Sequence, residues 1–502
     1  MSIAYLSRRV RAELAIALVA ALPFCAVLGH GFVYDDHWTI EGNPFLAEPL
    51  ASLVRTMFRG EGGYVGLPDA SRPVMVISTW IDRRLFGEWT LPYHLESLIL
   101  HAFNSVVAAR LALVLTRSRT KALVAGAWFA IVPVHVEVVS AINYREDLFA
   151  TLGVFVSLIA FLTPAERSHS WERGIAVAGA LAFGLGGKES ALVAPLLAVV
   201  LGTSLGIGRR GLAARERSIV LVVCVLILYL THRYAIALVD DEVARAPATP
   251  LWFRLAATVR YVVHGAFVSV VPLGPRPFQP TVLGTVWTTA GSAFVLVCLV
   301  AMAIRFRANR AAFAGLAIVL LVPFASSPLT SAANETADRY FYGSALGGGL
   351  LVAAALEWLA SRLDRRVVVA IGIGVLVPTI ATTALGSLVW RDDLTLFRTS
   401  VALEPRDPRP RIALAWILRI HGDLDGAERE LDVAASLDPR DDRIHLARGM
   451  LAAARGDTAT ARLIAQAIAR RWGAIPGLSA LNRCADASPE RARACARSIT
   501  NR

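Results

Sequence analysis

The chain has 502 residues, of which 55% are hydrophobic and 18% are charged, and its mean hydropathy is +0.54. A soluble domain carries about 25% charged residues, so this composition excludes an ordinary soluble protein and indicates a multi-pass membrane protein. The net charge of +12 does not indicate nucleic-acid binding, because most basic residues lie in short clusters between apolar stretches, where they set membrane topology.

The first apolar run covers residues 12–33 and follows an arginine-rich start. Its length is close to the roughly 20 residues that a transmembrane helix needs. It is too long for the apolar core of a signal peptide, and no small-residue cleavage site follows it. We therefore expect an uncleaved first transmembrane helix.

Ten further apolar stretches are predicted to span the membrane. They cover residues 93–116, 121–136, 144–163, 173–187, 190–207, 218–239, 289–304, 311–325, 343–361 and 366–388. With about eleven spans in total, all six arginine-rich clusters fall on one side, which the positive-inside rule makes cytoplasmic. One more apolar stretch, 252–272, would break this agreement if it crossed. We therefore interpret it as an interfacial or re-entrant segment with an interrupted helix.

We expect the protein in the inner or plasma membrane of the cell. This topology places its longer polar segments together outside the cytoplasm. These are the loops 32–92, 240–288 and 326–342 and the chain after residue 390. The inner connections are short and basic. The asymmetry predicts that the functional site faces outward.

Two adjacent aspartates, Asp35 and Asp36, follow the first span directly. Keeping two neighbouring carboxylates at a membrane boundary is costly, because they repel each other and lose water. The pair therefore suggests a general base or the binding of a cation. The alternative is a solvated stop after a helix.

Charged residues also stand at other outer helix ends. Lys188 and Glu189 lie between two apolar runs, where they either neutralise each other or offer an ammonium to an anionic head group. Arg339, between Asp338 and Tyr340, suits recognition of a phosphate, since a guanidinium binds phosphate through paired hydrogen bonds.

Imidazole and carboxylate side chains form a third candidate group. His94 and His101 lie seven residues apart, on one face of a predicted helix, and His135 and Glu137 stand near the end of the next one. Intramembrane histidines often only satisfy a neighbouring helix. These four residues could form a metal site together, but no HExxH motif or close His/Cys cluster supports one, so none is predicted.

The tail after residue 390 is polar and repeats with a period of 34 residues. The repeated positions are Pro405 and Pro439, Gly422 and Gly456, Asp423 and Asp457, and Ala427 and Ala461. This period predicts tetratricopeptide-type helical hairpins, of which about two are visible. Cys484 and Cys495 follow them, in what the topology makes an oxidising compartment.

The order of these segments resembles the transmembrane and tetratricopeptide-repeat protein O-mannosyltransferases, a branch of the GT-C glycosyltransferases. The similar stretches are Phe32 to Asp36 with Asn43-Pro44, Ser71 to Pro73, Tyr93 to His101, Val132 to Glu137, Tyr144 to Leu148, Gly187 to Glu189, Asp338 to Tyr342 and Trp390 to Phe397. The resemblance implies an all-α GT-C-like membrane domain (1–390) and a helical repeat domain (391–502). It also implies a polyprenyl-phosphate sugar donor and an acidic pair in the first outer loop, which Asp35 and Asp36 match.

The expected activity is the inverting transfer of a sugar, mannose or another hexose, from the lipid carrier to an outer protein hydroxyl or glycan. Asp35 or Asp36 would be the base, and Arg339, Lys188 and Arg145 the phosphate partners. The cavity would include His94, His135, Glu137, Glu189, Asp338 and Tyr340. No redox cofactor is expected. The alternatives are a membrane-anchored repeat scaffold for an envelope complex, and a transporter or flippase, which would need ionisable residues at mid-span.

Overall fold

A computed structural model describes residues 3–59, 72–164, 170–239, 250–274, 276–277, 286–329, 337–473, 475 and 477–498. These residues form helices and contain no strand, which confirms the all-α prediction. The chain divides into two compact units. The first contains most of the chain up to Leu388, and the second contains residues from Val389 onward together with Gly31–Gly42 and Arg276.

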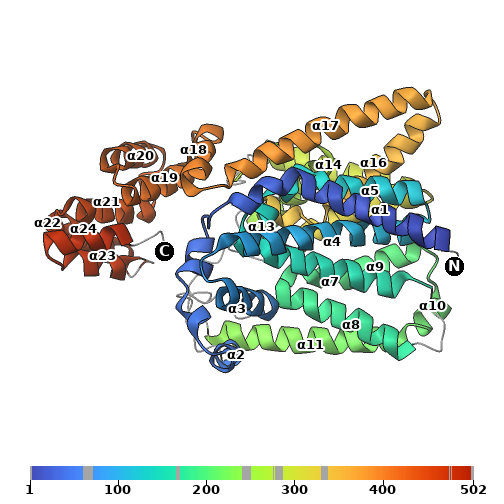
Figure 1. Ribbon diagram of the computed structural model, residues 1–502, viewed down its shortest axis with the longest axis horizontal. Coiled ribbons are helices and arrows are strands. Elements are labelled where there is room, and N and C mark those ends of the chain that lie inside the picture. The colour runs from blue at the N-terminus through green and yellow to red at the C-terminus, as the bar shows by residue number, and fades with distance from the viewer. Residues whose placement is uncertain are drawn as a thin grey trace. The chain divides into compact units, whose positions relative to one another are not determined.

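Most helices of the first unit match the predicted spans to within a few residues, although the first begins at Ile3 rather than at residue 12, and the helix predicted to end at residue 136 ends at Ile131. They are α1 (Ile3–Ala21, continued by η1, Leu22–Gly29), α4 (Thr90–Thr116), α5 (Arg119–Ile131), α7 (Arg145–Leu162), α8 (Ser170–Gly187), α9 (Val193–Ser204), α11 (Glu216–Val239), α14 (Val286–Arg305), α15 (Arg310–Ala325), α16 (Ala345–Ala360) and α17 (Arg365–Val389). Figure 1 shows α4, α7, α8 and α11 lying side by side.

Among the described residues, five helices are long and apolar enough to cross a membrane, or six if the bent pair Arg119–Ile131 and Pro133–Ser140 is one span. The chain is therefore a multi-pass membrane protein, and the number of eleven spans stays a prediction. The bend of 49° follows from Pro133, which has no backbone N–H and forces Val132 into an extended conformation.

Small residues let neighbouring helices of this unit approach closely. A Cβ atom on Gly153 of α7 would lie 2.5 Å from the Cα atom of Gly184 in α8. Close backbone contact of this kind stabilises helix pairs where lipid, rather than water, surrounds them.

The segment predicted to be re-entrant is α13 (Leu251–Val270), and its helix is continuous, so the predicted interruption is wrong. Its two ends lie at the same end of the bundle. Arg254 donates hydrogen bonds to the carbonyls of Pro328 and Leu329, just after α15. At its other end, Ser269 is hydrogen-bonded to Ser344, just before α16. Since residues 326–344 join α15 to α16, these contacts favour an interfacial helix over a crossing one.

Two helical hairpins form the repeats of the second unit: α19 (Pro408–Ile420) with α20 (Leu424–Leu437), and α21 (Asp442–Arg455) with α22 (Thr458–Trp472). Equivalent residues do equivalent work. Asp423 and Asp457 cap α20 and α22 by accepting backbone N–H bonds from Gly426 and Thr460. The preceding glycines have φ of +86° and +83°, which explains why the turn requires them. The 34-residue period therefore reflects real helical hairpins.

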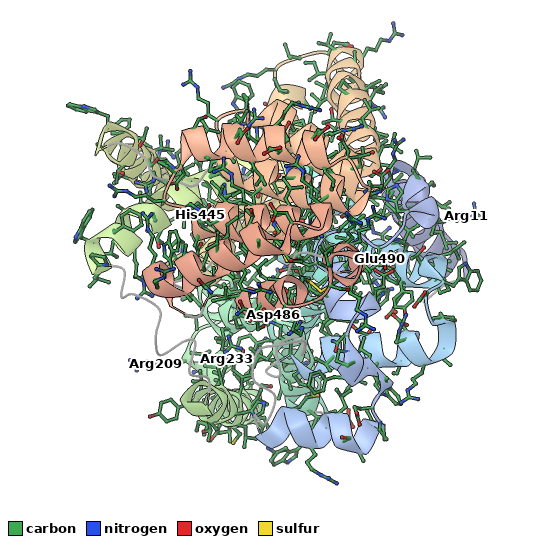
Figure 2. The ribbon with its side chains drawn as sticks, turned by 90° about the vertical axis from the view of Figure 1, so that its left-hand side faces the viewer. Arg11, Arg209, Arg233, His445, Asp486 and Glu490 are labelled. Carbon is green, nitrogen blue, oxygen red and sulfur yellow. A yellow bond between two sulfur atoms is a disulfide. The ribbon has the colours of Figure 1, made fainter. Side chains whose placement is uncertain are left out.

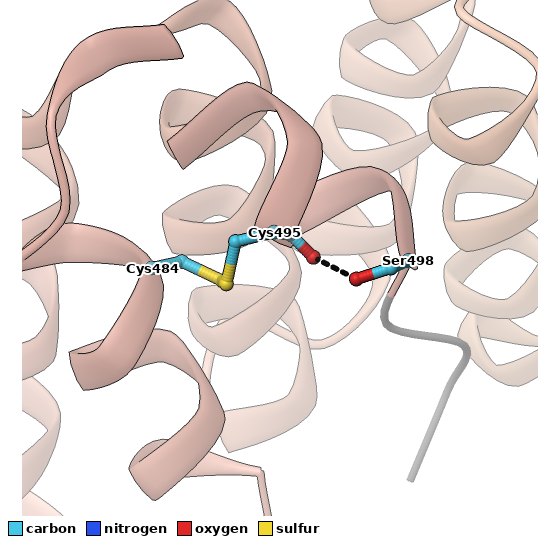
Figure 3. Close-up of a disulfide and its surroundings, with 3 residues drawn as sticks. All are labelled: Cys484, Cys495 and Ser498. Carbon is cyan, nitrogen blue, oxygen red and sulfur yellow. Dashed lines mark hydrogen bonds between the residues drawn. A yellow bond between two sulfur atoms is a disulfide. The ribbon is translucent and has the colours of Figure 1, made fainter. Parts of the chain in front are cut away.

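Two short helices, α23 (Leu478–Ala485) and α24 (Pro489–Ser498), complete this unit. A disulfide joins them through Cys484 and Cys495, and Ser498 Oγ donates to the Cys495 carbonyl (Figure 3). Asp486 and Glu490, labelled in Figure 2, are exposed residues between the two cysteines. Disulfides persist in oxidising compartments, which agrees with an outer location for the tail.

Candidate functional site

A cluster of charged side chains lies around η8 (Asp338–Phe341) in the first unit. This charged cluster consists of Arg72, Glu137, Asp338, Arg339, Glu146, Asp147, Lys188 and Glu189. Arg339 forms an ion pair through Nη1 with Glu137 of α6 (Val136–Ser140), and its backbone N–H donates to the same carboxylate at 3.2 Å. Glu137 is 3% exposed, so Arg339 supplies the charge that this buried carboxylate requires. The structure thus brings together two of the predicted site residues.

Two tyrosine rings hold the Arg339 guanidinium in place. Its Cζ atom lies 4.2 Å from the ring centre of Tyr144 and 4.7 Å from that of Tyr340, and Nη2 donates to the Tyr340 hydroxyl at 3.1 Å. A guanidinium stacked in this way is oriented with little freedom. Its side chain stays 19% exposed. Asp338 is buried beside it, with one oxygen 3.9 Å from His264 Nε2.

Lys188 is a deeply buried member of this cluster and contacts Tyr340 and two carboxylates. Its Nζ atom lies 2.7 Å from Asp147 and 2.8 Å from Glu146, and 4.8 Å from the ring centre of Tyr340. Burial opposes the charge of Lys188, but these two carboxylates outweigh it and raise its pKa above the ordinary value. Lys188 therefore holds Tyr340 and two buried acids together, and is less suited than Arg339 to contact a ligand directly.

Replacement of Lys188 by alanine is expected to destabilise the protein, because Glu146 and Asp147 would lose the ammonium that compensates their buried charge. Removing one partner of a buried pair costs about 3–5 kcal/mol. Thermal unfolding of the purified protein in detergent measures the loss. Lys121→Ala is the matched control: Lys121 pairs with the half-exposed Glu357, and such pairs contribute about 1 kcal/mol or less. Equal unfolding temperatures for both variants would contradict this role.

Arg72 is a member of the cluster that we did not predict as a site residue. It pairs with Glu146 through Nη1 and with both oxygens of Glu189, at 3.1 Å from Nη2. Its side chain is 21% exposed. The one available signal was its place in the Ser71 to Pro73 stretch, at the start of α3 (Pro73–Phe86). Its carboxylate partners lie 74 and 117 residues away, beyond the reach of a local pattern.

Arg145 stands apart from this cluster, although it was predicted to bind phosphate. It is fully enclosed, with Nη1 2.6 Å from both Asp82 and Glu96, and Nη2 donates to the Tyr93 carbonyl. These contacts join α3, α4 and α7. With no exposed surface and two carboxylates beside it, Arg145 is placed to hold three helices together.

The histidines likewise contact neighbouring helices. His94 is fully buried, with its ring centre 5.9 Å from that of His30. His135 packs in another place, 5.1 Å from the His101 ring and 3.2 Å from the Tyr342 carbonyl. The structure therefore does not bring His94 and His135 into one group.

A pocket opens beside Arg339, between α7, α9, α15 and the residues around η8. It is lined by Asp147, Ala150, Thr151, Val154, Phe155, Ser190, Val193, Val322, Arg339, Tyr340, Tyr342 and Gly343. Its polar residues belong mainly to the charged cluster, whereas α7, α9 and α15 contribute mostly apolar walls. The pocket has a volume of only about 20 Å³, which is room for about one water molecule. Its lining, rather than its size, therefore points to a ligand, because a guanidinium beside apolar side chains suits an anionic group attached to an apolar chain.

Asp35 and Asp36 belong to the second unit. Asp36 is buried and accepts a hydrogen bond from the Val33 backbone N–H at 3.2 Å. Asp35 is partly exposed and accepts one from the Trp38 indole at 3.2 Å. The pair is thus folded into a structured turn rather than left as a solvated stop.

The next residue, His37, links this turn to the start of α18 (Asp393–Leu403). Its Nδ1 atom lies 2.5 Å from Glu41 and its Nε2 atom 2.7 Å from Asp393. Burial disfavours the imidazolium, but the two carboxylates outweigh it and raise the pKa of His37 from 6.5 to about 9.

This shift predicts that stability depends on pH. Because the folded pKa lies above the unfolded value, the contribution of His37 is complete below pH 6.5 and is lost as the pH rises through about 9. The protein should unfold at a lower temperature at pH 9.5 than at pH 6.5. Part of that difference should disappear in His37→Gln, and an identical pH dependence in both proteins would contradict the ion pairs.

Comparison with known proteins supports the resemblance. No family model matches the chain. The protein O-mannosyl-transferase F38B6.6 of Caenorhabditis elegans is 23% identical over 447 residues, covering 86% of this chain and 64% of that protein. Tmtc1 of Drosophila melanogaster is 33% identical over 149 residues, covering 28% of this chain and 17% of that protein. The chain therefore spans less than two thirds of the length of these relatives.

Among solved structures, the chain is similar to the archaeal oligosaccharyltransferase AglB of Archaeoglobus fulgidus, solved with an inhibitory peptide and a dolichol-phosphate. The TM-score is 0.41 at 12% identity, over 77% of this chain and 56% of that one. The resemblance to the protein O-mannosyl-transferases rests on the relatives found by sequence and not on this structural similarity. They confirm that this membrane protein is a homologue of the protein O-mannosyl-transferases.

Proposed function

We propose that this protein is an inverting membrane glycosyltransferase that uses a polyprenyl-phosphate sugar. The observation that carries the proposal is the partly exposed Arg339 guanidinium next to apolar side chains of α7, α9 and α15. A lipid phosphate combines the same two properties. The similarity to protein O-mannosyl-transferases supports a hexose, with mannose first, and a protein Ser or Thr hydroxyl as the acceptor.

In the proposed reaction, the acceptor hydroxyl gives its proton to Asp35 or Asp36 as its oxygen forms a bond to the anomeric carbon. The bond from that carbon to the phosphate oxygen breaks, and polyprenyl phosphate leaves with both bonding electrons. Arg339 stabilises the negative charge on this leaving group through charge-assisted hydrogen bonds. Attack opposite the leaving group inverts the anomeric carbon.

The other proposed site residues hold Arg339 and its neighbours in position for this step. Glu137 and Tyr340 orient Arg339, and Lys188 holds Tyr340 together with Asp147. Glu189 and Arg72 form the next ion pair of the cluster. A preorganised array of this kind contributes because it does not have to rearrange as charge develops.

A membrane-anchored scaffold is the second candidate function, favoured by the two helical hairpins of the tail. The two functions differ in what a cell needs. Glycoproteins of the cell envelope are compared among the parent, a deletion strain and a strain with Asp35→Asn/Asp36→Asn. Catalysis predicts that the double variant lacks the same glycans as the deletion. Normal glycans with the double variant, but not with the deletion, would support the scaffold.

The site is proposed to face outside the cytoplasm, and the tail with it. Free thiols are first blocked, and a membrane-impermeant thiol reagent is then applied to intact cells before and after reduction. Labelling of Cys484 and Cys495 only after reduction is expected, since a disulfide between them would persist in an oxidising space outside the cytoplasm. Control labelling of a Cys484→Ser/Cys495→Ser variant measures the background from the three other cysteines. Labelling only after the membrane is broken would place the tail inside.

A further inference from the structure

Within the second unit, the turn that contains Asp35 and Asp36 packs against the segment around the start of α18, which lies more than 350 residues away in sequence. Gly31 N–H donates to the Arg391 carbonyl at 3.3 Å, and the rings of Tyr34 and Phe397 lie edge to face with centres 5.8 Å apart. Contact clustering accordingly places Gly31–Gly42 in the second unit. These contacts show that the pair and α18 fold as one body.

Asp393 provides the most specific of these links, because each of its carboxylate oxygens holds one side of the acidic pair. Oδ1 accepts the Tyr34 backbone N–H at 2.8 Å, and Oδ2 lies 2.7 Å from His37 Nε2. Tyr34 directly precedes Asp35, and His37 directly follows Asp36. One side chain of α18 therefore fixes the backbone before the pair and the side chain after it.

The backbone at this position would not hold its conformation unaided. Tyr34 has φ of +55°, in the left-handed region that non-glycine residues rarely adopt. Such a conformation is unfavourable by itself and persists when surrounding contacts determine it. The hydrogen bond from Tyr34 N–H to Asp393 is a contact of this kind, and the turn it stabilises sets the direction of the next two side chains.

We propose that Asp393 and His37 are positioning residues that hold the Asp35–Asp36 carboxylates in their reactive orientation. The second unit would then contribute to catalysis directly, in addition to binding an acceptor through its repeats. This inference rests on the proposed function. It explains why the first residue of α18, which precedes the repeat hairpins, is an aspartate whose two carboxylate oxygens both contact the turn.

The test is the steady-state transfer kinetics of the purified full-length protein, with a polyprenyl-phosphate mannose as donor. Asp393→Ala removes both links and is expected to lower kcat at least tenfold, because small displacements of a reacting group carry large penalties. His37→Gln removes one link and should have a smaller effect. The donor KM should change less than twofold in both, since neither residue is among the proposed phosphate-binding residues.

Asp392→Asn is the matched control, because Asp392 caps α18 by accepting from Thr395 N–H and asparagine caps equally well. It removes a carboxylate next to Asp393 and should keep the parental kcat. The double variant Asp393→Ala/His37→Gln should be no slower than Asp393→Ala alone, because the two residues share one link.

The outcomes separate this inference from the proposed function. If Asp35→Asn/Asp36→Asn abolishes transfer while Asp393→Ala keeps the parental kcat, the positioning role is wrong and the base assignment stands. An increase in donor KM at constant kcat would also overturn it. If the Asp35→Asn/Asp36→Asn protein transfers sugar normally, the proposed catalytic pair is itself wrong.

Discussion

Asp35→Asn/Asp36→Asn is expected to abolish sugar transfer while the protein still inserts in the membrane and accumulates. The amides keep the size of the carboxylates but cannot accept the proton of the acceptor hydroxyl. Loss of a general base lowers the rate roughly 10²–10⁴-fold. Transfer of radiolabelled mannose to an acceptor peptide, at saturating donor, measures this change.

Single variants separate the two acids. Asp36 is buried against the Val33 N–H, so Asp36→Asn tests a residue that also shapes the turn. Asp35 is partly exposed and contacts the Trp38 indole. Comparable unfolding temperatures of the variants are the control for folding. Full activity of both single variants and of the double variant would remove the pair from the mechanism.

Arg339→Lys is the second change with a large expected effect. Lysine keeps the positive charge next to the buried Glu137 carboxylate, so folding should be largely retained. It loses the planar fork that can bind phosphate and stack between Tyr144 and Tyr340. We expect kcat/KM for the lipid-linked donor to fall roughly 10–100-fold, in line with the loss of one or two charge-assisted hydrogen bonds.

Arg84→Lys is a matched control for this exchange. Arg84 also combines a cation–π contact, to Trp80, with hydrogen bonds, here to the backbone carbonyls of Ala47 and Glu48, but it is not part of the charged cluster. It should leave donor use unchanged. Parental kcat/KM in Arg339→Lys would show that Arg339 serves only to neutralise Glu137.

The sequence was sufficient for those parts of the fold that depend on local pattern. Apolar runs predicted most helix bounds within a few residues, because membrane burial imposes a minimum length on each run. The 34-residue period predicted the hairpins, because each needs its turn glycine and its capping aspartate at the same offset. The continuous α13 was not predicted, because the positive-inside rule argued only against a crossing at 252–272, and the interrupted helix was inferred from that argument rather than from any break in the local pattern.

The candidate site was only partly predictable, because the partners of a charged residue are set by long-range packing. Arg339 and Glu137 were both chosen from their position at helix ends, but their ion pair joins residues 202 apart. Arg145 and Lys188 looked equally suitable in sequence, yet each is buried against two carboxylates. Nothing near Asp35 in sequence indicates that Asp393 would hold its turn.

Sugar transfer from a polyprenyl phosphate can be followed in a reconstituted assay with defined components. The purified protein is placed in lipid vesicles with polyprenyl-phosphate mannose labelled in the sugar and a Ser/Thr-rich acceptor peptide. The proposed mechanism predicts labelled peptide and an equal amount of released polyprenyl phosphate, with an inverted anomeric linkage, and neither product with Asp35→Asn/Asp36→Asn. Equal labelling of the peptide by the parent and by this variant would contradict it.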